Sequence, residues 1–164
     1  MALFNEGGLA EDLFSDVSIG DELTAKGTLI VSLNQWRENR DKLIGRSEPL
    51  GIRLKSDEKP EEISADLRHF SVIALEFPAF RDGRAYSYAR LLRERYGYTG
   101  ELRAVGDVLL EQLHFMHRVG FNAFSITDDD AMRAWEIAAA DFSVWYQPTG
   151  DGRASVMALR HGRR

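Results

Sequence analysis

The fold is decided by residues 77–106, which read FPAFRDGRAYSYARLLRERYGYTGELRAVG. The middle of this stretch has helical periodicity, and one apolar stripe is formed by Ala85, Tyr88, Ala89, Leu92 and Tyr96. Apolar runs lie on both sides, at residues 72–76 and 101–105, and Gly97 begins a glycine-containing exit from the helix. This order predicts two parallel strands joined by a crossover helix.

The same rhythm continues in both directions along the chain. Strands are expected at residues 28–33, 50–55, 72–76, 101–105 and 123–126. Helices are expected at about 35–44, from Pro60 to about Phe70, at 85–96, at 108–119 and from Thr127 or Asp128 onward. Residues 154–159 have the composition of one more short strand. The pattern predicts an α/β fold of about five mostly parallel strands alternating with helices, either an open three-layer sheet or a half-barrel-like arrangement.

Length and charge suggest how the chain is divided. At 164 residues it is long enough for one domain, which we place at residues 28–150. Residues 1–27 form an acidic N-terminal segment with six carboxylates against one lysine, and residues 151–164 form a basic C-terminal tail. Both ends are expected to be solvated rather than to dock.

Composition also excludes several kinds of function. The chain contains no cysteine, so thiolate nucleophiles, thiolate-bound zinc and cysteine-ligated iron–sulfur clusters are absent. Its net charge of −5 argues against nucleic acid as a partner. No apolar run is long enough to cross a membrane, and residues 1–10 do not read as a secretory signal, so we expect a cytoplasmic protein. No phosphate-binding glycine loop or dinucleotide motif is present, so no cofactor is evident.

The candidate binding surface follows from where parallel α/β sheets bind ligands, which is outside the carboxyl ends of the strands. Arginines that precede a helix after the third expected strand could hold an anion or a protein partner. An ordinary turn with a local salt bridge explains the same residues. The candidate residues for anion or partner binding are Phe80, Arg81, Asp82, Arg84, Arg103 and Asp107.

Three further patterns have ordinary structural explanations. Carboxylates at three successive strand ends could hold magnesium: Glu76, Asp107 and Asp128 to Asp130. Helix capping explains Asp107 and Asp128 without a metal, and we predict no metal site. The spacing of Glu111, His114 and His117 resembles metal-ligand spacing, yet ordinary helix residues explain it better. An aromatic group could stack on a flat ligand, but core packing or a protein interface is the commoner use: Phe77, Phe80, Tyr86 and Tyr88.

Five blocks of sequence carry a family resemblance: LEFPAFRDGR (75–84), Tyr86-Ser87, ARLLR (89–93), GELRAVGDV (100–108) and GFNAF (120–124). Through them, residues 73–124 resemble an uncharacterised bacterial family described as probable oxidoreductases involved in sulfite reduction. Where this chain has Glu76 before the Phe-Pro pair, family members have aspartate, so the acidic type is kept.

The resemblance implies a role in bacterial assimilatory sulfite reduction but transfers no catalytic residue. Because the sequence offers no redox group of its own, we expect an accessory or partner protein, with a component of sulfite reductase or a small oxyanion at the strand ends. The alternative is an oxidoreductase that acts at the same edge with an externally supplied redox cofactor. A third hypothesis is a purely structural subunit, and the sequence does not decide whether the chain is an enzyme.

Overall fold

The computed structural model describes residues 2–5, 8–17, 23, 27–126, 133, 135–137, 144–149 and 153–162. The strands in this part are β1 (Ala2–Asn5), β2 (Gly8–Ala10), β3 (Phe14–Asp16), β4 (Thr28–Ser32), β5 (Leu50–Leu54), β6 (Val72–Phe77), β7 (Glu101–Gly106) and β8 (Ala123–Ile126). They form one eight-stranded sheet in the order β2-β1-β8-β7-β6-β5-β4-β3. The pairs from β3 through β8 are parallel, whereas β1 runs antiparallel to both β2 and β8.

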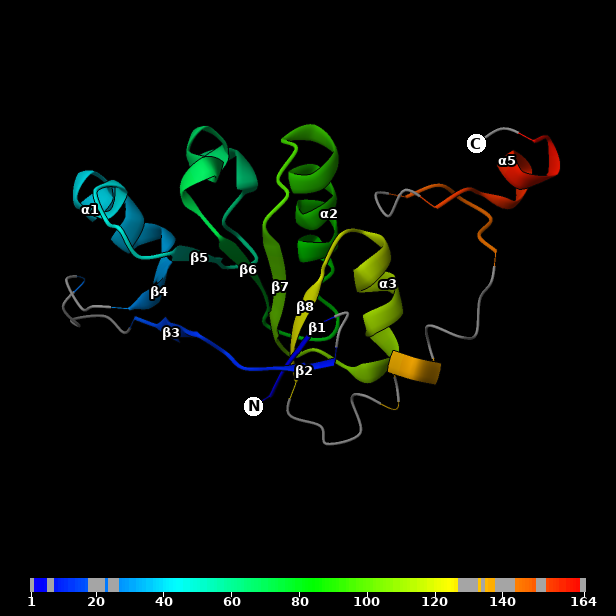
Figure 1. Cartoon of the computed structure of the whole chain (residues 1–164), viewed down its shortest axis with the longest axis horizontal. Helices are drawn as coiled ribbons and strands as arrows, with labels where there is room; N and C mark the ends of the chain where they lie inside the picture. Colours follow the sequence, from blue (N-terminus) through cyan, green and yellow to red (C-terminus); the bar gives the residue numbers. More distant parts are fainter. Residues whose placement is uncertain are drawn as a thin grey trace.

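The chain length between the two edge strands shows that this sheet is curled. In a flat sheet, the seven spacings between β2 and β3 would add up to roughly 34 Å at about 4.8 Å each. Only residues 11–13 connect these two strands, and such a segment spans at most about 14 Å. The sheet therefore forms a half-barrel, and the segment from β2 to β3 crosses its open side (Figure 1).

Helices alternate with the parallel strands. They are α1 (Leu33–Ile44), the 3₁₀-helix η1 (Pro60–His69), α2 (Arg84–Arg90) with its π-helical continuation η2 (Leu91–Arg95), the 3₁₀-turn η3 (Leu110–Gln112), α3 (Leu113–Arg118) and α5 (Val156–Arg160). Helices α1, η1, α2 and α3 lie on one side of the sheet (Figure 1). None of the helices in the described residues is both long and apolar enough to cross a membrane.

The core lies between these helices and the convex face of the sheet. Alternate strand residues such as Ile52, Ile73 and Leu102 are fully buried there and pack on the apolar stripes of the helices. A polar contact locks α1 to η1, because Asp66 accepts bonds from Arg40 Nε (2.9 Å), Arg40 Nη2 (2.6 Å) and Trp36 Nε1 (3.3 Å). The Arg40 guanidinium lowers the pKa of the Asp66 carboxyl.

The α/β class and the mostly parallel strand order are confirmed, and the half-barrel is the form adopted. Two parts differ from expectation, and a third is not described. The sheet has eight strands rather than about five, because residues 2–16 supply three, so it extends beyond residues 28–150. Residues 156–160 form a helix rather than a strand, with the Ser155 hydroxyl accepting a bond from Ala158 N. The expected helix start at Thr127 or Asp128 lies outside the described residues.

Candidate functional site

The 78–83 loop, which joins β6 to α2, lies at the carboxyl end of the sheet. Asp82 N donates to Ala79 O at 2.9 Å, so residues 79–82 form a β-turn with Phe80 and Arg81 at its two central positions. The Phe80 side chain is 52% exposed, and Arg81 is exposed as well. Within the described part of the chain, Arg81 has no ion-pair partner. The turn thus presents an aromatic ring and a cation to solvent.

The end of β7 holds this turn from one side. Asp107 Oδ2 accepts a bond from Phe80 N at 2.8 Å, and Asp107 N donates to Phe77 O at 2.8 Å. This geometry depends on Gly106, which has φ +95. A Cβ atom at that position would lie 3.1 Å from the carbonyl carbon of Phe77 and closer still to its oxygen. Only glycine at position 106 leaves room for the Phe77 carbonyl to accept the hydrogen bond from Asp107 N.

The start of α2 holds the turn from the other side. Arg84 donates to both carboxylate oxygens of Asp82, from Nε at 2.9 Å and from Nη2 at 2.6 Å. Its Nη2 also donates to Ser56 Oγ at 2.8 Å, which ties the turn to the loop after β5. Hydrogen bonds from Arg84 hold the pKa of the Asp82 carboxyl well below its usual range. The Nε and Nη2 groups of Arg84 are therefore committed to the turn and to Ser56.

Five of the six candidate residues lie together at this edge, and the sixth, Arg103, does not. Arg103 lies in the middle of β7 between the core residues Leu102 and Ala104, so its side chain points to the opposite, concave face. That side chain is 4% exposed. Its Nη1 bonds both oxygens of Asp12 at 3.0 and 2.9 Å, and its Nε bonds Glu101 Oε1 at 2.7 Å.

The concave face thus carries a charged network that the sequence did not predict. Arg53 of β5 extends it, pairing with Glu76 Oε2 at 3.2 Å and with Asp16 Oδ2 at 3.4 Å. Both arginines bind carboxylates of residues 11–16, so ion pairs hold the N-terminal segment across the open side of the half-barrel. An arginine buried in a sheet requires such partners, because an unpaired buried charge is costly.

The weaker patterns also have their places in the structure. Asp107 bonds to the 78–83 loop, not to a helix start as the capping interpretation expected. Among the described residues no group of His, Asp or Glu side chains could hold a metal ion, and Asp128 falls outside them. The His114 ring stacks on the Trp145 ring, with 4.8 Å between the ring centroids. Phe77 is a core residue whose ring centroid lies 5.4 Å from that of Tyr86.

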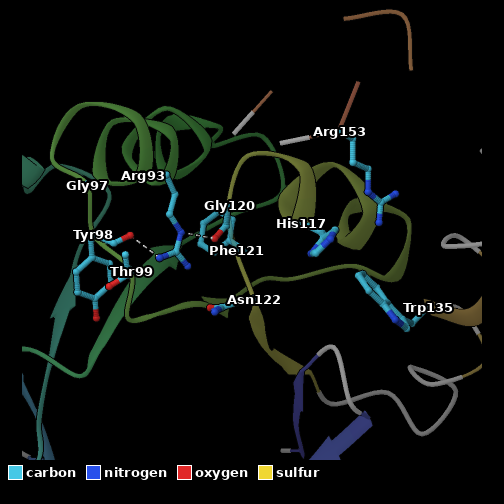
Figure 2. Close-up of a pocket in the computed structure, with 10 residues that line it drawn as sticks. All are labelled: Arg93, Gly97, Tyr98, Thr99, His117, Gly120, Phe121, Asn122, Trp135 and Arg153. Carbon is cyan, nitrogen blue, oxygen red and sulfur yellow. Dashed lines mark hydrogen bonds between the residues drawn. The ribbon is translucent and has the colours of Figure 1, made fainter. Parts of the chain in front are cut away.

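A cavity of about 770 Å³ opens at the other end of the sheet, where β7 and β8 begin. Figure 2 shows ten residues that line it, which come from η2, the η2–β7 connection, α3 and the α3–β8 connection, together with Trp135 and Arg153. Arg93 joins two of these connections, because its Nε donates to Gly120 O at 2.9 Å and its Nη1 to Tyr98 O at 2.7 Å.

Sequence reasoning missed this cavity. Arg93 lies off the apolar stripe of its helix and reads as a solvated charge, and His117 reads as an ordinary helix residue. The sequence shows a glycine at position 120 but not the reason for it. In the structure Gly120 has φ +115, and a Cβ atom there would collide with the Arg93 side chain. This contact depends on η2 lying next to the α3–β8 connection, which the sequence does not reveal.

Residues 51–157 match the model of one family, described as a bacterial protein of unknown function (DUF934). The match covers the 78–83 loop together with β6 and β7, and it includes the ten cavity residues drawn in Figure 2. Neither the curated proteins nor the solved structures contain a significant match to the chain.

Proposed function

The chain belongs to the bacterial DUF934 family, and from that premise we propose that it is an accessory or partner protein in bacterial assimilatory sulfite reduction. The biological setting of the proposal comes from the sulfite-reduction family that residues 73–124 resemble, a segment that lies inside the matched range 51–157. The proposed docking surface is the tip of the 78–83 loop.

One observation carries the docking role, which is the exposure of Phe80 and Arg81 at the tip of a turn that is held on both sides. Aromatic residues and arginine are enriched among the residues that dominate binding energy at interfaces. The turn is already ordered by Asp107 and by the Arg84–Asp82 pair, so little conformational entropy remains to be lost on binding. An exposed aromatic ring on such a turn fits insertion into a pocket of a partner protein.

The same contacts favour a protein partner over a small oxyanion. Anion capture by this loop needs guanidinium groups whose donors face solvent. Arg84, at the start of α2, directs its Nε and Nη2 donors to Asp82 and Ser56 and is paired in charge with Asp82. That leaves Arg81, within the loop, without an ion-pair partner among the described residues. A single exposed cation is a weak oxyanion site, whereas a cation beside an aromatic ring is a common element of protein interfaces.

Co-purification from the source bacterium tests this proposal. The tagged full-length chain is expected to retain a sulfite reductase component, and the double variant Phe80→Ala/Arg81→Ala is expected to lose it while keeping the wild-type melting temperature. The matched control is Phe115→Ala/Arg95→Ala, which removes an exposed aromatic ring on α3 and an exposed arginine at the far end of η2. Retention by the loop variant, or no retention by the wild type, would contradict the proposal.

Growth of a deletion strain provides a second readout. Without the gene, growth on sulfate or sulfite should slow and should recover when sulfide or cysteine is supplied. Complementation by the control variant should restore growth, whereas the loop variant should not. Purified protein that reduces sulfite by itself, given only an electron donor, would show an enzyme and not a partner.

A further inference from the structure

We propose that the cavity at the amino ends of β7 and β8 is a binding site for a mononucleotide, meaning a heteroaromatic ring that carries a phosphate group. This proposal is independent of the docking role of the 78–83 loop, which lies at the opposite end of the sheet. It rests on the charge, the aromatic lining and the size of the cavity.

The cavity lining is cationic in an acidic protein. The described residues that line it include Arg93 and Arg153 but no aspartate or glutamate, although the chain has a net charge of −5. Charges of one sign that line a concave surface concentrate ligands of the opposite sign. The electrostatic preference of this cavity is therefore for an anion.

The two arginines have different parts in binding that anion. Arg93 Nε and Nη1 bond to the carbonyl oxygens of Gly120, Tyr98 and Gly100, at 2.9, 2.7 and 2.8 Å, so it supplies a fixed positive charge at the wall. Arg153 comes from a segment more than fifty residues away in sequence and lines the cavity (Figure 2). Its guanidinium carbon lies 5.7 Å from the centroid of the Trp145 ring, a cation–π contact that helps to position the side chain. Arg153 is exposed and is the phosphate ligand in this proposal.

The aromatic lining accounts for the ring of the ligand. Trp135 packs against the core at Phe4 and Phe124, with ring centroids 5.7 and 5.9 Å apart, and is only half-buried. Its ring meets the His117 ring edge to face at 5.2 Å. An indole anchored in this way is a rigid surface on which a flat heteroaromatic ring stacks.

Hydrogen-bonding groups and volume complete the fit. The Asn122 side chain is oriented by Leu102 N, which donates to its Oδ1 at 2.8 Å, so its amide nitrogen is left to serve as a donor. The Thr99 hydroxyl is a second polar group of the lining. A volume of about 770 Å³ lies within the range of roughly 300–1,000 Å³ typical of small-molecule sites and exceeds what a bare oxyanion fills.

Isothermal titration of the full-length protein tests the proposal with AMP and FMN as probes and with adenosine and inorganic phosphate as their separate parts. At least one of the two mononucleotides should bind with a Kd below about 1 mM, and at least tenfold more tightly than adenosine or phosphate. Arg153→Ala should weaken that binding by about 10- to 100-fold, because it removes a charge-assisted hydrogen bond to phosphate.

Two control variants separate this site from other sources of binding. Arg160→Ala removes an exposed arginine of α5 and should leave the titration unchanged, and so should Phe80→Ala/Arg81→Ala in the docking loop. Failure of both mononucleotides to bind, equal binding of phosphate alone, or wild-type affinity in Arg153→Ala would each overturn the proposal. Loss of partner docking with nucleotide binding intact would leave it standing.

Discussion

Replacing Gly106 by alanine adds only one methyl group, yet it should lower the free energy of unfolding strongly. The residue has φ +95, a conformation that costs an L-residue roughly 1–2 kcal/mol. The new Cβ atom would also press on the Phe77 carbonyl, which accepts the 2.8 Å bond from Asp107 N. Relieving such an overlap in packed surroundings costs about another 1–3 kcal/mol.

Gly97 is the matched control for this substitution, because it also has a positive φ, +64, but no atom lies within 4 Å of the Cβ it would gain. Gly97→Ala should therefore lose only the conformational part, roughly 1–2 kcal/mol. At about 2–4 °C per kcal/mol for a chain of this size, Gly106→Ala should melt roughly 4–20 °C below wild type and well below Gly97→Ala.

Differential scanning calorimetry of the three proteins measures this comparison, and hydrogen exchange of the Phe80 and Asp107 amides locates the damage. Faster exchange at these two amides in Gly106→Ala alone would agree with a turn held by the end of β7. Equal melting temperatures for the two alanine variants would refute the argument that Gly106 is required by the close approach of β6.

Three further substitutions test the ion pairs of the fold. Asp66→Asn should lower the free energy of unfolding by about 1–3 kcal/mol at pH 7, measured by urea unfolding, because it removes the charged acceptor of Arg40. The pKa of Asp66 in the folded protein lies below its unfolded value near 4. The stabilisation from this carboxylate is therefore present above about pH 4 and is lost as the pH falls through the folded pKa. A deficit that persists undiminished at pH 2 would contradict that origin. Asp12→Ala should cost about 1–2 kcal/mol and expose residues 8–16 to proteolysis, because it removes one of two carboxylates from the buried Arg103. Asp16→Ala, whose side chain is 64% exposed and 3.4 Å from Arg53, should change stability by less than about 0.5 kcal/mol, and equal losses in the two variants would be inconsistent with the buried role of Arg103.

Strands β4 to β8 were predictable because each is a run of four to six residues rich in apolar side chains, and stretches with helical spacing separate these runs. Strands β1, β2 and β3 were not predictable, because they contain three or four residues each and include Asn5, Ser15 and Asp16. β1 pairs with β8 and β3 pairs with β4, and local strand propensity does not predict contacts between separate segments of the chain. The curl of the sheet follows from that same pairing.

The candidate site was partly predictable for a similar reason. The rule that parallel strands end at one edge brought Asp107 and residues 80–84 together correctly. The ion pair between Asp82 and Arg84 depends on side-chain directions at the start of α2, which spacing alone does not give. Arg103 could have been assigned to the other face, because residues alternate along a strand and its neighbours Leu102 and Ala104 are both apolar.

The affinity of the purified chain for purified sulfite reductase tests the central claim most directly. The account predicts a measurable complex, and it predicts that Phe80→Ala/Arg81→Ala weakens this complex by about 30-fold or more, as expected when residues that dominate an interface are removed. Phe115→Ala/Arg95→Ala should bind like wild type. No complex with the wild-type chain, or equal affinity of the loop variant and the wild type, would contradict the account.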